Sequence, residues 1–413
     1  MPTSITQLLT NRRLVAIFFM AFASGLPLAL TGSTLQAWFT EANVSLVTIG
    51  TLSLIGLPYT LKFLWAPLLD HYHFPWLGRH QVWVFISQIG LVTALVFIAF
   101  LNPHENARAM GVVALMVAIF SATQDIAIDA YRTDILSAEE RGVGVSYTVL
   151  MYRMAMLVSG GLALVFADHM GWRLTYLLMA GLMLLSMIPT IIAPRPAETH
   201  ISEKYLWQTF KEAISDLLTR DHIILLLLFL MFYKFGDALA LQLFTNFLLR
   251  GLGFTLTEVG MAYKLVSFIA TISGAFVGGL FLTRWTTIRA LFVFGLAQAF
   301  SNLTFVILAI VGKQFALMAS AVFIENFCSG MSTAALFAFM MSLCNTRYSA
   351  GQFALLSAVA SLGRILLGPL AGVLVARYGW TLFFTTAFIA SFPGMLFLAL
   401  MKERGFLYAH AVK

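Results

Sequence analysis

The sequence predicts an all-α membrane protein with twelve transmembrane helices in two six-helix halves. Of its 413 residues, 60% are hydrophobic and only 10% are charged, and the mean hydropathy is +0.89. A soluble domain contains about 25% charged residues. Apolar runs of about 20 residues, each long enough to cross a bilayer, recur along the whole chain. A soluble protein is therefore excluded.

The apolar runs fix the position of each helix to within a few residues. The predicted helices span 14–39, 46–69, 82–101, 107–130, 144–167, 173–193, 222–249, 257–282, 290–311, 315–342, 352–376 and 380–401. One long break, 194–221, holds two prolines and a charged stretch whose apolar residues recur at helical spacing. We expect an amphipathic helix in this cytoplasmic linker, between an N-terminal half (1–193) and a C-terminal half (222–413).

The distribution of basic residues predicts the orientation in the membrane. If the N-terminus is cytoplasmic, fifteen Lys and Arg fall on the inner side and five on the outer side, and five lie within the spans. Cytoplasmic loops carry the excess of positive charge in most membrane proteins. We therefore expect both termini in the cytoplasm, as an even number of helices requires, and attribute the net charge of +7 to orientation and not to nucleic acid.

An internal repeat relates the two halves. The segment MGWRLTYLLMAG at 170–181 matches YGWTLFFTTAFIA at 378–390, an offset of 208. SGLPLAL at 24–30 matches FGDALAL at 235–241, an offset of 211. The Ile-Gly and Val-Gly pairs at 49–50 and 259–260 give 210. Offsets near half the chain length indicate a duplicated six-helix unit, as in two-halved secondary transporters.

Ionisable residues inside the predicted helices mark the candidate functional positions. They are Lys62, Asp125, Asp129, Arg153, Lys234, Asp237, Lys264, Glu325 and Arg364. Such groups are costly in a membrane and persist as structural ion pairs or as binding and proton-transfer groups. Asp125 and Asp129 share one helix face because they are four residues apart. Lys234 and Asp237, three apart, are neighbours on one turn; they can pair with each other or face the cargo.

Several long motifs resemble the AmpG muropeptide permease family, a branch of the major facilitator superfamily related to acetyl-CoA transporters. These motifs are FASGLPLALTGSTLQAW (22–38), KFLWAPLLDHY (62–72), SATQDIAIDAYRTDILSAEERG (121–142) and YRMAMLVSGGLAL (152–164). The resemblance implies a major facilitator fold and a proton-coupled importer in the bacterial inner membrane that acts on sugar-peptides from cell-wall turnover. Another hydrophilic cargo, such as a siderophore or a peptide, is an alternative.

The resemblance also implies which helices line the central cavity: the first, fourth, seventh and tenth. For proton coupling we expect Asp125 as the carrier and Asp129 as its partner, with Glu325 as the rival carrier. Burial and a neighbouring carboxylate both favour the neutral form that a proton carrier needs. We expect the cargo to contact polar side chains on the same helices: Gln36, Gln124, Lys234, Asp237 and Asn326.

A cytoplasmic gate is predicted at the inner ends of the first half. Asp70 and Arg79 resemble the Asp and Arg of the loop between the second and third helices of the superfamily. Arg132 and Arg141 lie beyond the fourth helix and are the basic residues with which such a gate can close. Asp129 can belong to this gate instead of the proton site.

Other classes of protein have less support. No HExxH, GxSxG or P-loop motif occurs, and both carboxylates of the Asp125 and Asp129 pair lie on one helix, so an intramembrane enzyme is disfavoured. A membrane receptor would not need charged groups on three cavity helices. We expect no cofactor and no metal site. The expected partners are a small-molecule substrate, protons and membrane lipid, for a chain acting as a monomer.

Overall fold

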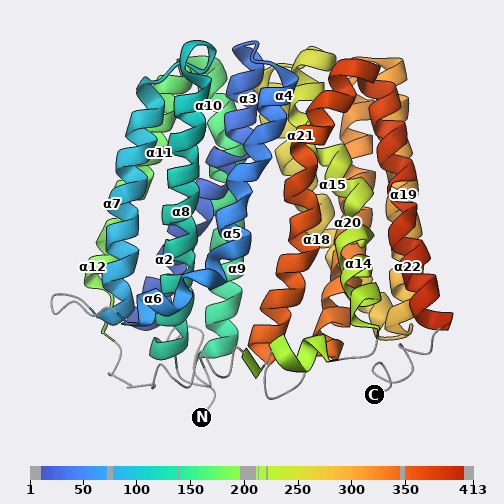
Figure 1. The fold of residues 1–413 in the computed structure, drawn as a ribbon. Coiled ribbons are helices and arrows are strands. Elements are labelled where there is room, and N and C mark those ends of the chain that lie inside the picture. Colours follow the sequence, from blue (N-terminus) through green and yellow to red (C-terminus); the bar gives the residue numbers. More distant parts are fainter. Residues whose placement is uncertain are drawn as a thin grey trace. The chain divides into compact units, whose positions relative to one another are not determined.

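The chain is helical throughout the part that is described. The computed structural model describes residues 11–71, 78–136, 140–195, 211–212, 214–219, 222–344 and 349–403, and no strand occurs among them. The longer helices of the first half are α2 (Arg12–Thr31), α3 (Ser33–Glu41), α7 (Arg79–Phe100), α8 (Pro103–Ile135), α9 (Arg141–Leu157), α10 (Ala163–Met170) and α11 (Trp172–Leu185) (Figure 1). Shorter helices are α4 (Leu46–Thr51), α5 (Leu57–Leu61), α6 (Ala66–His71) and α12 (Met187–Ile192).

The helices of the second half range from three to 41 residues in length. They are α14 (Ile223–Tyr233), α15 (Phe235–Gln242), α16 (Phe244–Asn246), α17 (Leu256–Glu258), α18 (Val266–Leu282), α19 (Thr287–Val311), α20 (Phe315–Leu343), α21 (Ser349–Ile389) and α22 (Phe392–Glu403). Two π-helical turns join neighbouring helices into continuous spans: Val158–Leu162 connects α9 to α10, and Val259–Leu265 connects α17 to α18. A third, Phe247–Gly251, ends the span that contains α14, α15 and α16.

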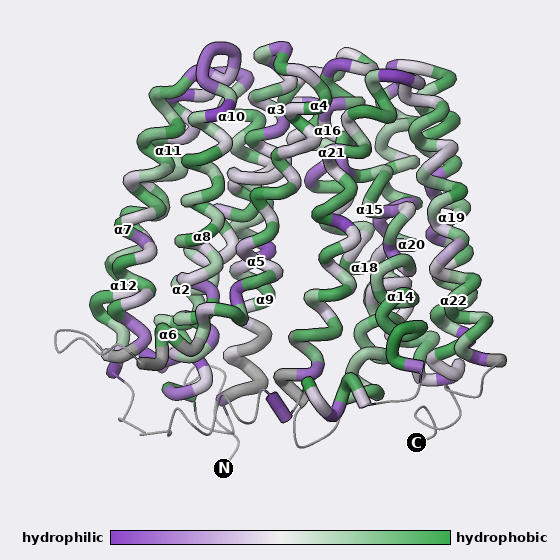
Figure 2. Tube along the Cα trace, in the orientation of Figure 1, coloured by the Kyte–Doolittle hydropathy of each residue, from purple (hydrophilic) through white to green (hydrophobic). Residues whose placement is uncertain are grey.

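The described residues contain the twelve predicted membrane crossings. Eleven stretches of the described residues are long and apolar enough to cross a membrane. The last of them, Leu355–Lys402, has 48 residues and turns sharply at Gly379, where φ is 76°. At 1.5 Å per residue it would measure about 72 Å, more than twice the ~30 Å of a hydrocarbon core, so it makes two crossings. Hydrophobic residues dominate the middle of the helices (Figure 2).

The chain divides into two compact units. One short segment of the first half of the sequence belongs to the second unit by its contacts. The first unit comprises Met1–Val44 and Ile55–Tyr205; the second comprises Ser45–Leu54 and Leu206–Lys413. Within the second unit, α4 packs directly on α21. A Cβ atom on Gly50 would lie 2.3 Å from the carbonyl oxygen of Gly368. Only glycine permits so close an approach of two backbones.

The repeat seen in the sequence recurs in the backbone. Gly171 and Gly379, 208 residues apart, both have positive φ (80° and 76°), and each precedes a tryptophan. Asn43 (φ 56°) and Gly253 (φ 75°), 210 apart, occupy the corresponding turns before α4 and α17. Each of these turns is followed two residues later by a hydroxyl N-cap that accepts from the third helical N–H. Equivalent positions therefore use the same turn chemistry in both halves of the sequence.

Breaks in the helices place polar residues at mid-span. Gly32 separates α2 from α3, and Lys234 separates α14 from α15 with non-helical backbone (φ −105°, ψ 13°). In the second unit, α18 and α20 approach closely because Gly274 and Gly330 carry no side chain: a Cβ on Gly274 would lie 2.1 Å from the carbonyl oxygen of Phe327. This contact between α18 and α20 determines which face of α20 points towards α14 and α15, the helix that is broken at Lys234.

The predicted linker lies mostly outside the described residues. Of 194–221, the structure describes 194–195 as irregular, with helical backbone at 211–212 and 214–218. Leu217 is buried and belongs to the apolar core of the second unit, together with residues of α14, α20 and α22. The end of the linker is therefore packed against the second unit.

Candidate functional site

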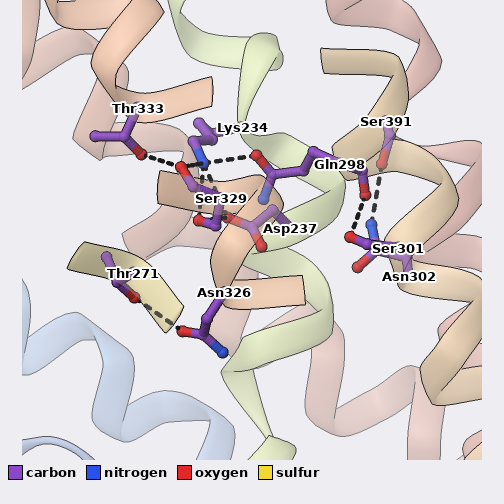
Figure 3. A network of polar contacts seen from close by, with 10 residues as sticks. All are labelled: Lys234, Asp237, Thr271, Gln298, Ser301, Asn302, Asn326, Ser329, Thr333 and Ser391. Carbon is purple, nitrogen blue, oxygen red and sulfur yellow. Dashed lines mark hydrogen bonds and ion pairs between the residues drawn. The ribbon is translucent and has the colours of Figure 1, made fainter. Parts of the chain in front are cut away.

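A buried polar network surrounds Lys234 in the second unit. Its ammonium group lies 2.7 Å from Gln298 Oε1 and 2.9 Å from the hydroxyl oxygen of Ser329, and it donates hydrogen bonds to both (Figure 3). It also lies 3.5 Å from Asp237 Oδ2, so the predicted neighbours form an ion pair. These four residues come from α15, α19, α20 and the break before α15. Of the two alternatives that the sequence spacing left open, pairing with each other or facing the cargo, the structure shows the Lys234–Asp237 pair.

Glu325 lies beside this network without a hydrogen-bond donor of its own. Its side chain is completely buried, and neither carboxyl oxygen meets a donor among the described residues. Its neighbour is a second carboxyl group, that of Asp237, whose Oδ1 also lacks a donor. A buried ionised carboxylate without hydrogen bonds costs several kcal/mol. A single proton shared by the pair removes this cost, because protonated Glu325 can then donate to Asp237.

In the first unit, Asp125 is satisfied by partners from other helices. Its carboxylate accepts a hydrogen bond of 2.5 Å from Ser24 in α2 and lies 3.8 Å from the ammonium of Lys62. Its side chain is 12% exposed, whereas that of Lys62 is 34% exposed. Asp125 therefore already has both a cation and a donor.

Asp129 points elsewhere, although it shares a helix with Asp125. Its side chain is 54% exposed and lies 3.0 Å from the guanidinium of Arg132. At the same end of the first unit, His80 lies 3.1 Å from Asp134, and Arg13 lies 3.7 Å from Glu140. Asp129 and Arg132 thus belong to a group of acid–base pairs at the helix ends, and their role in a gate stays a prediction.

The other predicted gate residues are described only in their backbone. Asp70 lies in α6, and Arg79 and Arg141 begin α7 and α9. Their side chains lie outside the described part of the structure. All three backbone positions lie at or next to helix ends, and their role in a gate stays a prediction.

The predicted amide ligands have different surroundings. Gln124 is completely buried, and both polar atoms of its side chain lack a partner among the described residues. Gln36 is half-buried in α3. The amide of Asn326 donates to the carbonyl of Val322 and accepts from Thr271 at 3.4 Å, so it links α20 to α18. Asn326 therefore contributes to helix packing.

Sequence reasoning missed Gln298 and Ser329, two main partners of Lys234. Single amide and hydroxyl residues are common in membrane helices, where they link helices to one another. Gln298 does stand three residues before Ser301 and four before Asn302, and all three are buried. Such a polar face in the middle of an otherwise apolar helix was the available signal.

Comparison with known proteins identifies the family. The sequence pattern of the Major Facilitator Superfamily matches residues 17–366. Over 404 residues the chain is 44% identical to an anhydromuropeptide permease of Escherichia coli (strain K12), covering 98% of this chain and 82% of that relative. The chain belongs to this permease family within the superfamily.

More distant members of the permease family also match nearly the whole chain. A putative transporter, AmpG 4 of Rickettsia conorii, is 30% identical over 97% of this chain and 99% of its own length. Among solved structures, a D-xylose–proton symporter superposes with a TM-score of 0.67 over 94% of this chain and 96% of its own, at 12% identity. That likeness shows the major facilitator fold. The permease is a multi-pass membrane transporter and not an enzyme.

Proposed function

We propose that this permease imports muropeptide-type sugar-peptides into the cytoplasm by proton-coupled alternating access. The cargo class is supported by 44% identity to a protein named for anhydromuropeptides. One structural observation carries the coupling: a completely buried glutamate, Glu325, whose carboxyl oxygens have no donor among the described residues and which lies against the carboxyl of Asp237. Two adjacent carboxyl groups hold one proton more readily than two charges.

The network around Lys234 gives the proton a structural effect. With Glu325 protonated, its O–H donates to Asp237 Oδ1 while Oδ2 faces Lys234, and the three groups carry no net charge. Loss of the proton leaves two carboxylates in contact and one ammonium to neutralise them. Their repulsion favours a rearrangement of α15 against α20. Protonation and the relative positions of two helices are therefore linked, which is the requirement for coupled transport.

Asp125 takes a different role in this scheme. It is the first-half candidate for proton transfer, but its contacts with Lys62 and Ser24 favour a lasting ion pair. We expect Asp125→Asn to keep the Ser24 contact, lose the attraction to Lys62 and slow uptake roughly fivefold, the rate equivalent of about 1 kcal/mol. Accumulation driven by a proton gradient persists. An Asp125→Asn protein that exchanges cargo normally but cannot accumulate it would assign the proton to Asp125 instead.

The proposed function is tested by reconstituting the purified chain into liposomes. An external solution of lower pH than the lumen should drive labelled anhydromuropeptide into the vesicles above its external concentration. Dissipating the gradient with a protonophore should reduce the lumenal level to equilibrium. Uptake that ignores the gradient rejects proton coupling. A siderophore or an unrelated peptide that competes as well as unlabelled muropeptide rejects the proposed cargo.

Orientation and assembly complete the proposal. The excess of basic residues on the inner side supports cytoplasmic termini, and membership in a bacterial permease family supports the inner membrane. Each unit has an apolar core of its own, and we propose that a single chain in the lipid bilayer is the working form.

A further inference from the structure

Arg364 is a charged residue at the middle of a membrane crossing, and it has no role in the proton scheme proposed above. It lies fifteen residues after Ser349, where α21 begins, and fifteen before Gly379, where the crossing ends. At 1.5 Å per residue, each end is roughly 22 Å away. Arg364 therefore lies near the centre of the span.

The guanidinium is accessible, and no acidic partner lies within 4 Å of it among the described residues. Arg364 is exposed, whereas the residues on either side of it, Gly363 and Ile365, are buried. Its backbone carbonyl accepts a hydrogen bond from Gln242 of α15, which fixes this turn of α21 without engaging the guanidinium. A charge at this depth requires water or a partner.

The direction of the side chain excludes the lipid. In the part of the helix next to Arg364, the exposed apolar residues are Leu366, Leu370 and Val373, which are spaced at intervals of four and three and form one face. Arg364 precedes Leu366 by two positions, a rotation of about 200°, so it lies on the opposite face. An exposed charge on that face points to an aqueous space and not to acyl chains.

The surrounding charges leave an excess of positive charge at this face. Arg364 is within electrostatic range of Lys234. When Glu325 holds the proton, Lys234 is neutralised by Asp237 and the guanidinium is left without a counter-charge. Arginine binds carboxylates through two parallel hydrogen bonds, which makes a carboxylate the group that fits best.

We propose that Arg364 binds a free carboxylate of the cargo and thereby selects acidic sugar-peptides over neutral ones. This inference rests on the proposed function and names the chemistry that the site recognises. The protonated pair beside Lys234 leaves Arg364 available for the cargo. The deprotonated pair adds a competing negative charge nearby, so release of the proton weakens binding of the carboxylate.

The test compares labelled anhydromuropeptide with the same compound after methyl esterification of its carboxylates. The wild-type protein should take up the free acid with a markedly lower KM than the ester. Arg364→Gln should raise the KM for the free acid roughly ten- to hundredfold, the loss expected for one charge-assisted pair, and leave the KM for the ester unchanged. Arg364→Lys should restore part of the preference, because it keeps the charge without the bidentate geometry.

Arg377→Gln is the matched control on the same helix. Its guanidinium stacks over the ring of Tyr378 near the outer end of the crossing, and the preference for free acid should be unchanged. Equal KM values for acid and ester in the wild-type protein overturn the inference without any variant. Equal losses for both compounds in Arg364→Gln also overturn it, since they indicate a structural role. Failure of the wild-type protein to take up either compound rejects the proposed function, and the inference with it.

Discussion

Replacing Glu325 by glutamine is expected to leave a transporter that exchanges cargo but no longer accumulates it. Glutamine has nearly the size of protonated glutamate, and its amide can donate to Asp237 Oδ1, so the network is held in its proton-loaded state. A gradient of about two pH units can drive a roughly hundredfold accumulation when one proton enters with each cargo molecule. In the Glu325→Gln protein this ratio should fall to one.

Two assays on the same liposomes separate the proton cycle from transport itself. Counterflow, in which internal unlabelled cargo exchanges for external labelled cargo, needs no net movement of protons and should proceed. Glu258→Gln is the control, because Glu258 lies beside Lys313 with 33% of its side chain exposed and is remote from the network. Normal accumulation in Glu325→Gln would remove Glu325 from the proton pathway. Loss of counterflow as well would show a structural defect.

Replacing Lys234 by methionine is expected to have the largest effect on stability. Methionine fills a similar volume but leaves Asp237 buried without its cation, and Gln298 and Ser329 without their donor. Removing one member of a buried ion pair costs about 3–5 kcal/mol. The thermal unfolding midpoint of the purified protein in detergent measures this loss.

A second variant tests the cause of that loss. Adding Asp237→Asn to Lys234→Met removes the stranded charge and should recover a large part of the lost stability. Lys313→Met is the control at an exposed pair: the ammonium of Lys313 lies 3.3 Å from Glu258 with 45% of its side chain exposed. Its loss should cost less than about 1 kcal/mol. A double variant as unstable as Lys234→Met alone would contradict the ion-pair explanation.

The sequence predicted the fold well because the bilayer imposes a simple rule on each element. A crossing needs about 20 apolar residues, and such runs are visible without any knowledge of tertiary contacts. The predicted helix 222–249 and the observed stretch Ile223–Gly251 differ by only a residue or two at each end. The break at Gly379 was also predicted, because the expected helices ended at 376 and began again at 380.

Side-chain partners were harder to predict because they come from distant parts of the chain. Spacing along one helix made the Lys234–Asp237 pair one of two alternatives, and the structure shows that pair. The same reasoning placed Asp125 and Asp129 together, yet each has a cation of its own, Lys62 and Arg132. A shared helix face limits which residues can meet, but the neighbouring helices decide which do.

The packing of α4 in the second unit bears on how the protein can be divided. Ser45–Leu54 belongs to the N-terminal half by sequence, but Gly50 lies against Gly368, and Ser53 donates to the carbonyl of Ile365 at 2.8 Å. A polypeptide that starts at Leu206 would lack this segment, and the glycine surface of α21 would be bare. A split or chimeric permease divided at the linker therefore has an incomplete second half. The missing segment, Ser45–Leu54, lies about 150 residues before the division in the sequence.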